Sequence, residues 1–188
     1  LTTGKVKPGM VLGHEIVGEV AALGVGVNQF ALGDRVTVPH HVPCGSCRLC
    51  LNDNDTMCET FRDNLMEPGG FADHVLIRSR ATTQAARKLP DTVSDAAAVF
   101  MEPAACVLRG VNLSNLGPSG TAAVMGGGSM GLLHLLVIKA AFPNMKVLLI
   151  DPIAERCALA AKLGADKTAA PGDDALAASA AMSDGYGV

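Results

Sequence analysis

The sequence predicts two domains, a β-rich N-terminal domain and an α/β domain with a doubly wound parallel sheet. Three observations support this prediction. From Val11 to Ile77, short apolar runs are separated by Gly, Pro, Asn and Asp, which is typical of short strands joined by turns. At Leu89-Pro90 this pattern ends and helix-forming segments begin. From Thr121 onward, strand-like and helix-like apolar segments alternate, as they do in parallel α/β folds.

Composition limits the class of protein and its partners. Of the 188 residues, 49% are hydrophobic and 18% are charged, a globular composition that can bury a sizeable core. The net charge is -3, no basic run is present and only 3% of the residues are aromatic, which argues against nucleic acid as a partner. The longest apolar stretch, 132–142, is much shorter than the roughly 20 residues that a membrane crossing needs. We therefore expect neither nucleic-acid binding nor a membrane span.

The strand signals of the first domain are short. Val36 and Val38 alternate with polar neighbours until Pro39 ends the run. Gly69-Gly70 is a turn signal before a second apolar run that ends at Ile77. Both runs predict strands.

Helices are predicted where the two domains meet. Ser94 is expected to cap a helical run over 96–101. Pro103 is expected to interrupt that run, which places Glu102 at a helix break. A second helix is predicted over about 104–113.

The second domain shows a repeated strand–helix order. Gly164 is positioned to end one of its helices. The predicted strands are 121–125, 146–150 and 167–170, and the predicted helices are 130–142, 152–163 and 175–182.

Four of the six cysteines, Cys44, Cys47, Cys50 and Cys58, lie within fifteen residues. Zinc accepts four thiolates in a tetrahedron and has no redox chemistry, so the spacing predicts a structural zinc site in a reducing compartment such as the cytoplasm. Two local disulfides or reduced core cysteines are the alternative, which short Cys-x2-Cys loops disfavour. Cys106 and Cys157 fall on predicted helices, where core packing is expected.

Two further elements offer metal ligands. His14 and Glu15 lie side by side before a predicted strand, and Glu102 precedes a proline. Taken singly, a His-Glu pair is more often a surface pair, and Glu102 can be a simple helix-end carboxylate. His40 and His41 fall outside a known ligand spacing and are expected to be solvent-facing loop residues.

A glycine-rich turn follows the strand predicted at 121–125. Gly126, Gly128 and Gly131 fit the Gly-x-Gly-x-x-Gly pattern, with a predicted helix directly after it. In that context the glycines make the turn, admit a pyrophosphate and let helix and strand approach. The backbone N–H groups at the helix start, including those of Ser129 and Met130, are expected to face the phosphates.

Asp151 ends the next predicted strand, twenty residues after Gly131. A carboxylate at this place can accept hydrogen bonds from the adenosine ribose hydroxyls and would repel a 2′-phosphate. The sequence therefore favours NAD over NADP. Arg156, about one helical turn further on, is a second candidate contact to the cofactor and keeps NADP open.

Together these elements resemble the zinc-containing medium-chain alcohol dehydrogenase family, in particular its polyol and threonine dehydrogenase-like branch. The resemblance rests on the glycine and valine spacing over 13–27, the four cysteines, and Glu102-Pro103-Ala104-Ala105-Cys106. It implies that His14 is a ligand of a catalytic zinc, and that Glu15 and Glu102 are ligands or close neighbours that exchange with water. It also implies a GroES-like domain over 1–105 and a Rossmann domain over 106–188, each lacking a part.

The chain departs from the family at one point. The family's first catalytic ligand is a cysteine some twenty or more residues before the His-Glu pair, whereas thirteen residues precede His14 and none is Cys. Three protein ligands are usual for catalytic zinc, so His14 with one or two carboxylates is expected to bind metal weakly.

The resemblance implies a dehydrogenase that transfers a hydride between a secondary alcohol, such as a polyol or a hydroxy amino acid, and NAD. The full-length protein is expected to be a dimer or tetramer, and these 188 residues alone to be inactive and poorly soluble. Three alternatives remain: an NADP-linked aldehyde reductase of the same family, a non-catalytic zinc-stapled nucleotide-binding module, and a cinnamyl-alcohol-type reductase. Glu102-Pro103 disfavours the last.

Overall fold

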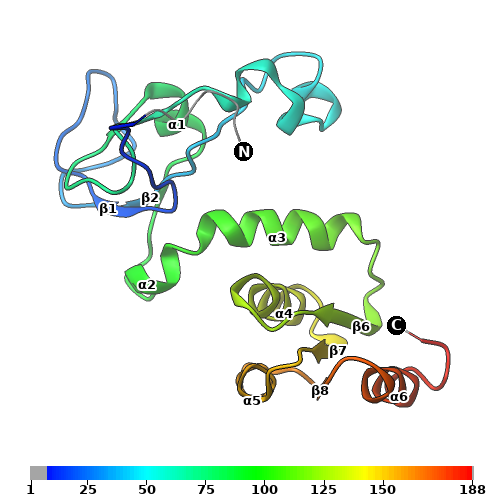
Figure 1. The fold of residues 1–188 in the computed structure, drawn as a ribbon. Coiled ribbons are helices and arrows are strands. Elements are labelled where there is room, and N and C mark those ends of the chain that lie inside the picture. Colours follow the sequence, from blue (N-terminus) through cyan, green and yellow to red (C-terminus); the bar gives the residue numbers. More distant parts are fainter. Residues whose placement is uncertain (1–7, 188) are drawn as a thin grey trace. The chain divides into compact units, whose positions relative to one another are not determined.

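The computed structural model describes residues 8–187, and the chain divides into two compact units, Leu1–Glu102 and Pro103–Val188 (Figure 1). The terminal residues 1–7 and 188 of the two predicted domains lie outside the described part. A β-rich unit precedes a unit built on a parallel sheet, which confirms the predicted fold class. Among the described residues, every helix is too short or too polar to cross a bilayer.

Short antiparallel strands form the first unit. Strands β1 (Val17–Glu19), β2 (Arg35–Thr37) and β5 (Arg87–Lys88) make one sheet in the order β1-β2-β5. Strands β3 (Met66–Glu67) and β4 (Leu76–Ile77) pair separately. The strands are short because glycine, proline and aspartate interrupt each apolar run, as the sequence predicted.

The core of the first unit combines strand-end and helix residues. It includes one helix that the sequence did not predict, α1 (Ser79–Gln84). The prediction missed this helix because its polar residues Ser79, Thr82 and Thr83 leave no apolar period typical of a helix. Tertiary contacts hold this helix: the Arg80 guanidinium donates to the Val42 carbonyl at 3.1 Å and to the Asp63 carboxylate at 2.8 Å. The buried cluster consists of Val38, Val42, Leu65, Ala81 and Ala86.

Helix α2 (Asp95–Ala98) begins as predicted, because the Ser94 Oγ accepts the Ala97 N–H at 3.3 Å. The predicted break at Pro103 is wrong. Helix α3 (Met101–Leu113) includes Pro103 in its first turn, where the N–H that proline lacks has no partner within the helix. Glu102 therefore lies in the first turn of α3 rather than at an interruption.

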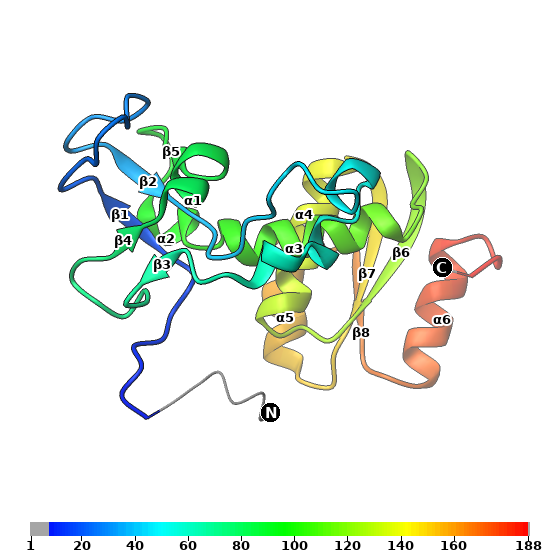
Figure 2. The same cartoon turned by 90° about the horizontal axis from the view of Figure 1, so that it is seen from above.

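The second unit has a three-stranded parallel sheet in the order β6-β7-β8. Figure 2 shows helices α4 and α5 on one side of this sheet and α6 on the other. The strands are β6 (Ser119–Met125), β7 (Asn144–Ile150) and β8 (Lys167–Ala169), and the helices are α4 (Ser129–Ala141), α5 (Ala154–Lys162) and α6 (Asp173–Met182). These elements confirm the predicted strand–helix alternation. Gly164 follows α5 with φ +102°, as its expected role at the helix end requires.

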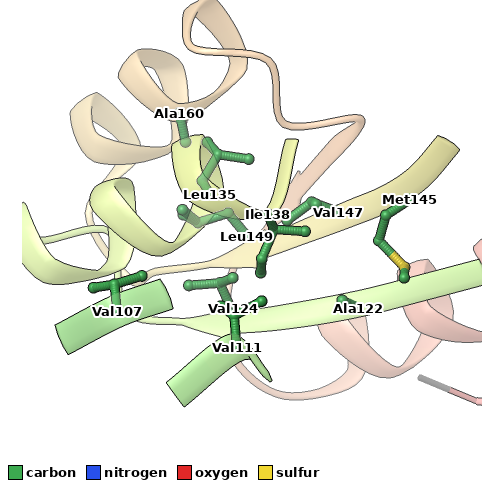
Figure 3. Close-up of a cluster of buried hydrophobic side chains, with 10 residues drawn as sticks. All are labelled: Val107, Val111, Ala122, Val124, Leu135, Ile138, Met145, Val147, Leu149 and Ala160. Atoms are coloured by element: carbon green, nitrogen blue, oxygen red, sulfur yellow. The ribbon is translucent and has the colours of Figure 1, made fainter. Parts of the chain in front are cut away.

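Strand β7 lies at the centre of the core. Val147, Leu148 and Leu149 are each fully buried, which requires cover on both faces of the sheet. One face contributes to the cluster in Figure 3, made of Val107, Val111, Ala122, Val124, Leu135, Ile138, Met145, Val147, Leu149 and Ala160. This core holds the carboxyl ends of β6 and β7 in register, with Met125 opposite Ile150.

Candidate functional site

The four clustered cysteines converge on one point. Their Sγ atoms all lie within 4.8 Å of one another, and the chain around them is wound into the short 3-10 turns η1 (Cys50–Asn52), η2 (Asp55–Met57) and η3 (Glu59–Arg62). Cys47 Sγ and Cys50 Sγ are 3.5 Å apart, well beyond the roughly 2.05 Å of a disulfide. Within residues 8–187 none of the cysteines is disulfide-bonded. The donor set suits a tetrahedral zinc ion, in agreement with the prediction.

Backbone donors favour ionisation of some of these thiols. The N–H groups of Ser46 and Cys47 point at Cys44 Sγ from 3.5 and 3.3 Å, and with the Ser46 hydroxyl they lower the pKa of Cys44 to about 6. Burial and the neighbouring Cys47 thiol raise the pKa of Cys50 to about 12. A cation is what would allow all four thiols to ionise together, so metal binding must release protons here.

A second group of possible metal ligands contains His14, His40 and Glu102. Each offers one ligand atom, and these atoms all lie within 4.8 Å of one another. His14 is exposed, whereas His40 and Glu102 are half-buried. Two imidazoles and one carboxylate are a donor set that binds zinc in proteins.

Strand pairing brings the two histidines together. Strands β1 and β2 are antiparallel with Val17 opposite Thr37, and the Thr37 hydroxyl donates to the Ile16 carbonyl at 2.8 Å. His14 lies three residues before Val17 and His40 three residues after Thr37, so the same register continued past the strands places them opposite each other. Their ring centroids are 4.3 Å apart.

The chain at His14 is fixed by a turn from far along the sequence. Gly70 N–H donates to the Gly13 carbonyl at 2.8 Å, and Phe71 N–H donates to the Leu12 carbonyl at 2.9 Å. Gly13 has φ +97°, and a Cβ there would lie 2.9 Å from the Phe71 nitrogen. Both observations require glycine directly before His14.

Glu15 and His40 take different places relative to this group of possible metal ligands. Glu15 is exposed and is not part of the converging group, since neighbouring side chains in extended backbone point to opposite sides. Its role as a ligand stays a prediction. His40 was expected to face solvent as a loop residue, yet it is half-buried beside His14. No feature of the local sequence identifies His40 as a member of this group, because only the pairing of β1 with β2 brings it beside His14.

The His40 ring is held in a neutral state. Burial, and then the charges of His41 and His14, lower the pKa of His40 to about 4. The His40 and His41 rings are 3.7 Å apart, and the His41 and Phe61 rings are 5.2 Å apart. A neutral imidazole is the form that binds metal ions.

The glycine-rich turn joins β6 to α4. Gly126 has φ +99°, and a Cβ at Gly131 would lie only 1.7 Å from the Gly126 oxygen. A Cβ at Gly128, by contrast, would meet no atom within 4 Å. Ser129 and Met130 form the exposed first turn of α4, so their N–H groups lie at the positive end of that helix. This arrangement suits a phosphate group over Gly128.

Asp151 is buried, with 3% of its surface exposed, and its carboxylate forms a hydrogen bond with the glycine-rich turn. Its Oδ2 accepts the Gly127 N–H at 2.6 Å, and its Oδ1 accepts the Ile153 N–H at 2.8 Å. Arg156 Nη1 lies 3.6 Å from Oδ2. The Gly127 N–H, the Ile153 N–H and the charge of Arg156 lower the pKa of Asp151. The predicted cofactor residues of the second unit thus meet at the carboxyl ends of β6 and β7.

Comparisons with known proteins agree with this pattern. Residues 1–91 match the model of the alcohol dehydrogenase GroES-like domain. The chain is 32% identical to sorbitol dehydrogenase of Bacillus subtilis, over 85% of this chain and 44% of that protein. It is 31% identical to L-threonine 3-dehydrogenase of Pectobacterium carotovorum, over 89% of this chain and 48% of that protein.

A solved structure supports the same assignment. An alcohol dehydrogenase from Escherichia coli CFT073, solved with NADH, superposes with a TM-score of 0.75 at 30% identity, covering 95% of this chain and 52% of that one. The chain therefore spans about half the length of the curated relatives it matches. With the four-thiol cluster and the β-rich to α/β order, these matches show that the chain belongs to the zinc-type medium-chain alcohol dehydrogenase family.

Proposed function

We propose that the protein is a zinc- and NAD-dependent dehydrogenase of a small secondary alcohol, a polyol or a hydroxy amino acid. The observation that carries this proposal is the meeting of His14 and Glu102, which are far apart in the sequence but offer ligand atoms within 4.8 Å of each other. The sorbitol and threonine dehydrogenases among its relatives support this substrate class.

His14, Glu102 and the four cysteines would hold zinc in two different ways. The four thiolates leave no open position, so that site is structural. The imidazole and carboxylate group leaves room for a substrate oxygen beside the ion. When bound, zinc there supplies a Lewis acid that lowers the pKa of an alcohol hydroxyl, and NAD supplies the hydride acceptor.

The residues of the second unit would position NAD. The N–H groups of Ser129 and Met130 would donate to the pyrophosphate, and Gly128 would let it approach the backbone. Asp151 would accept from the adenosine ribose while it holds the Gly127 N–H. We also propose that the full-length protein is a dimer or tetramer. A reducing compartment, the cytoplasm, is proposed because the cysteines of the four-thiol site are not disulfide-bonded.

Arg156 favours a second candidate, an NADP-linked alcohol or aldehyde reductase. Its guanidinium is half-exposed and lies 3.6 Å from Asp151, where it could turn toward a 2′-phosphate. Parallel titrations with NAD and NADP separate the two candidates, since Asp151→Ala should improve NADP binding relative to NAD.

The test of the proposed activity is reduction of NAD by the natural protein that carries this chain, with sorbitol, threonine and simple secondary alcohols offered in turn. Nicotinamide absorbance gives the rate. A His14→Ala variant should lose turnover while it retains NAD binding. We expect the 188 residues on their own to be poorly soluble, because within residues 8–187 strand β6 is an unpaired edge of the parallel sheet. Tight NAD binding without turnover by the natural protein would instead favour a non-catalytic nucleotide-binding module.

A further inference from the structure

His40 has an unusual environment for a surface histidine. It is half-buried, and its Nδ1 atom is fully buried with no hydrogen-bond partner among residues 8–187. Buried polar atoms are almost always paired, so an unpaired ring nitrogen calls for an explanation. A metal ion bound through Nδ1 is one explanation, because ligation would give this nitrogen a partner and fix the proton on Nε2.

We propose that His40 is a ligand of the ion held by His14 and Glu102, so that this part of the chain supplies two imidazoles and one carboxylate. The inference rests on the proposed function only in taking the His14–Glu102 group as a metal site.

The distances fit ligation after small side-chain rotations. Ligands that surround zinc tetrahedrally at about 2.0–2.1 Å lie about 3.4 Å from one another. The three ligand atoms lie within 4.8 Å of one another, so each must move by about 1 Å or less. Ordinary side-chain rotation supplies such a shift without moving β1 or β2.

The surroundings of His40 also hold its ring in place. The backbone leaves β2 through Thr37, whose hydroxyl donates to the Ile16 carbonyl and so ties the two strands together three residues before His40. The His41 ring packs against His40 at a centroid distance of 3.7 Å. His40 is thus pinned from its backbone side and from one ring face, while His14 lies at 4.3 Å. A ligand held this way loses little further freedom on binding.

Metal content and spectroscopy test the assignment without relying on turnover. The natural protein that carries this chain, loaded with zinc and dialysed, should hold two equivalents per subunit, and its His40→Phe variant should retain the four-thiol zinc but bind the second ion at least about tenfold more weakly. Phenylalanine keeps a packed ring and removes both ring nitrogens. His74→Phe is the matched control, since His74 is exposed in the same unit and lies outside both ligand groups; it should retain two ions.

A rescue variant adds a spectroscopic signature. With cobalt in the second site, His40→Cys should restore binding and raise the sulfur-to-metal charge-transfer absorption of this site above that of the unaltered protein, because thiolate replaces imidazole. Zinc kept in the four-thiol site during cobalt loading prevents that cluster from contributing its own band.

The outcomes separate this inference from the proposed function. If His14→Ala loses the second ion and His40→Phe binds it as tightly as the unaltered chain, His40 is not a ligand, although the proposed function stands. If the unaltered chain never holds a second ion, the metal premise of the proposed function fails as well. Loss of the four-thiol zinc in His40→Phe would mean that this variant misfolds. In that case the His40→Cys variant decides whether His40 is a ligand, and the absence of added sulfur-to-metal absorption would overturn the assignment.

Discussion

The Asp151 carboxylate accepts the Gly127 N–H at 2.6 Å, so the acidic end of β7 holds the glycine-rich turn that follows β6. This hydrogen bond therefore couples the conformation of the turn to the position of the carboxylate. Asp151 has two tasks, since the same side chain that is expected to meet the ribose also shapes the loop expected to meet the phosphates. A substitution at Asp151 should act on both.

The first prediction concerns Asp151→Asn. The amide keeps one acceptor oxygen but loses the charge and one of the two acceptors that serve Gly127 and Ile153. We expect NAD affinity to fall by about tenfold or more, measured by titration calorimetry. Asp173→Asn is the matched control, because Asp173 is an exposed aspartate in the first turn of α6. The NAD affinity of this variant should equal that of the unaltered protein.

The second prediction is a pH dependence of stability. The pKa of Asp151 is lowered in the folded protein by the Gly127 N–H, the Ile153 N–H and the charge of Arg156. A carboxyl whose folded pKa is depressed stabilises the fold above its unfolded pKa of about 3.9, and this contribution is lost as the pH falls through the folded value. Thermal melting should show the difference between the unaltered protein and Asp151→Asn shrinking below about pH 4. An unchanged difference in that range contradicts the prediction.

The third prediction contrasts two glycines of the turn. Gly131→Ala should unfold or strongly destabilise the second unit, because the new Cβ would lie 1.7 Å from the Gly126 oxygen. Gly128→Ala should leave the melting temperature nearly unchanged, since its Cβ meets no atom within 4 Å, yet weaken NAD binding by occupying the phosphate's approach. Melting curves and NAD titrations of both variants provide the check. Equal stability losses at the two positions would disprove the assigned roles.

The fourth prediction concerns the four-cysteine site. A strong zinc chelator should lower the melting temperature of the first unit, and Cys47→Ser should do the same without a chelator, because a zinc ion bound by the four thiols would close the η1–η3 segment. Zinc loading should release protons into a weakly buffered solution, since the pKa of Cys50 is raised to about 12 before metal binds. Cys106→Ser, a cysteine outside the cluster, should change neither result. Chelation that leaves the melting curve unaltered would argue against a structural role.

Local spacing determined much of this protein. The four cysteines lie within fifteen residues, and the glycine pattern lies between a strand and a helix, so both signals could be read before any fold was known. The Ser94 cap and the strand–helix order of the second unit were predictable for the same reason, because capping and apolar periodicity depend on neighbours in the chain.

Tertiary structure decided the rest. His40 reaches His14 only through the register of β1 and β2, and a register of non-local strands cannot be read from spacing. Helix α1 depends on Arg80 contacts to distant carbonyl and carboxylate groups rather than on its own propensity. Asp151 was expected from the sequence as a cofactor residue, but its grip on Gly127 follows from the packing of β7 beside β6. Interactions between residues distant in sequence therefore shape both candidate sites, and only the folded chain displays them.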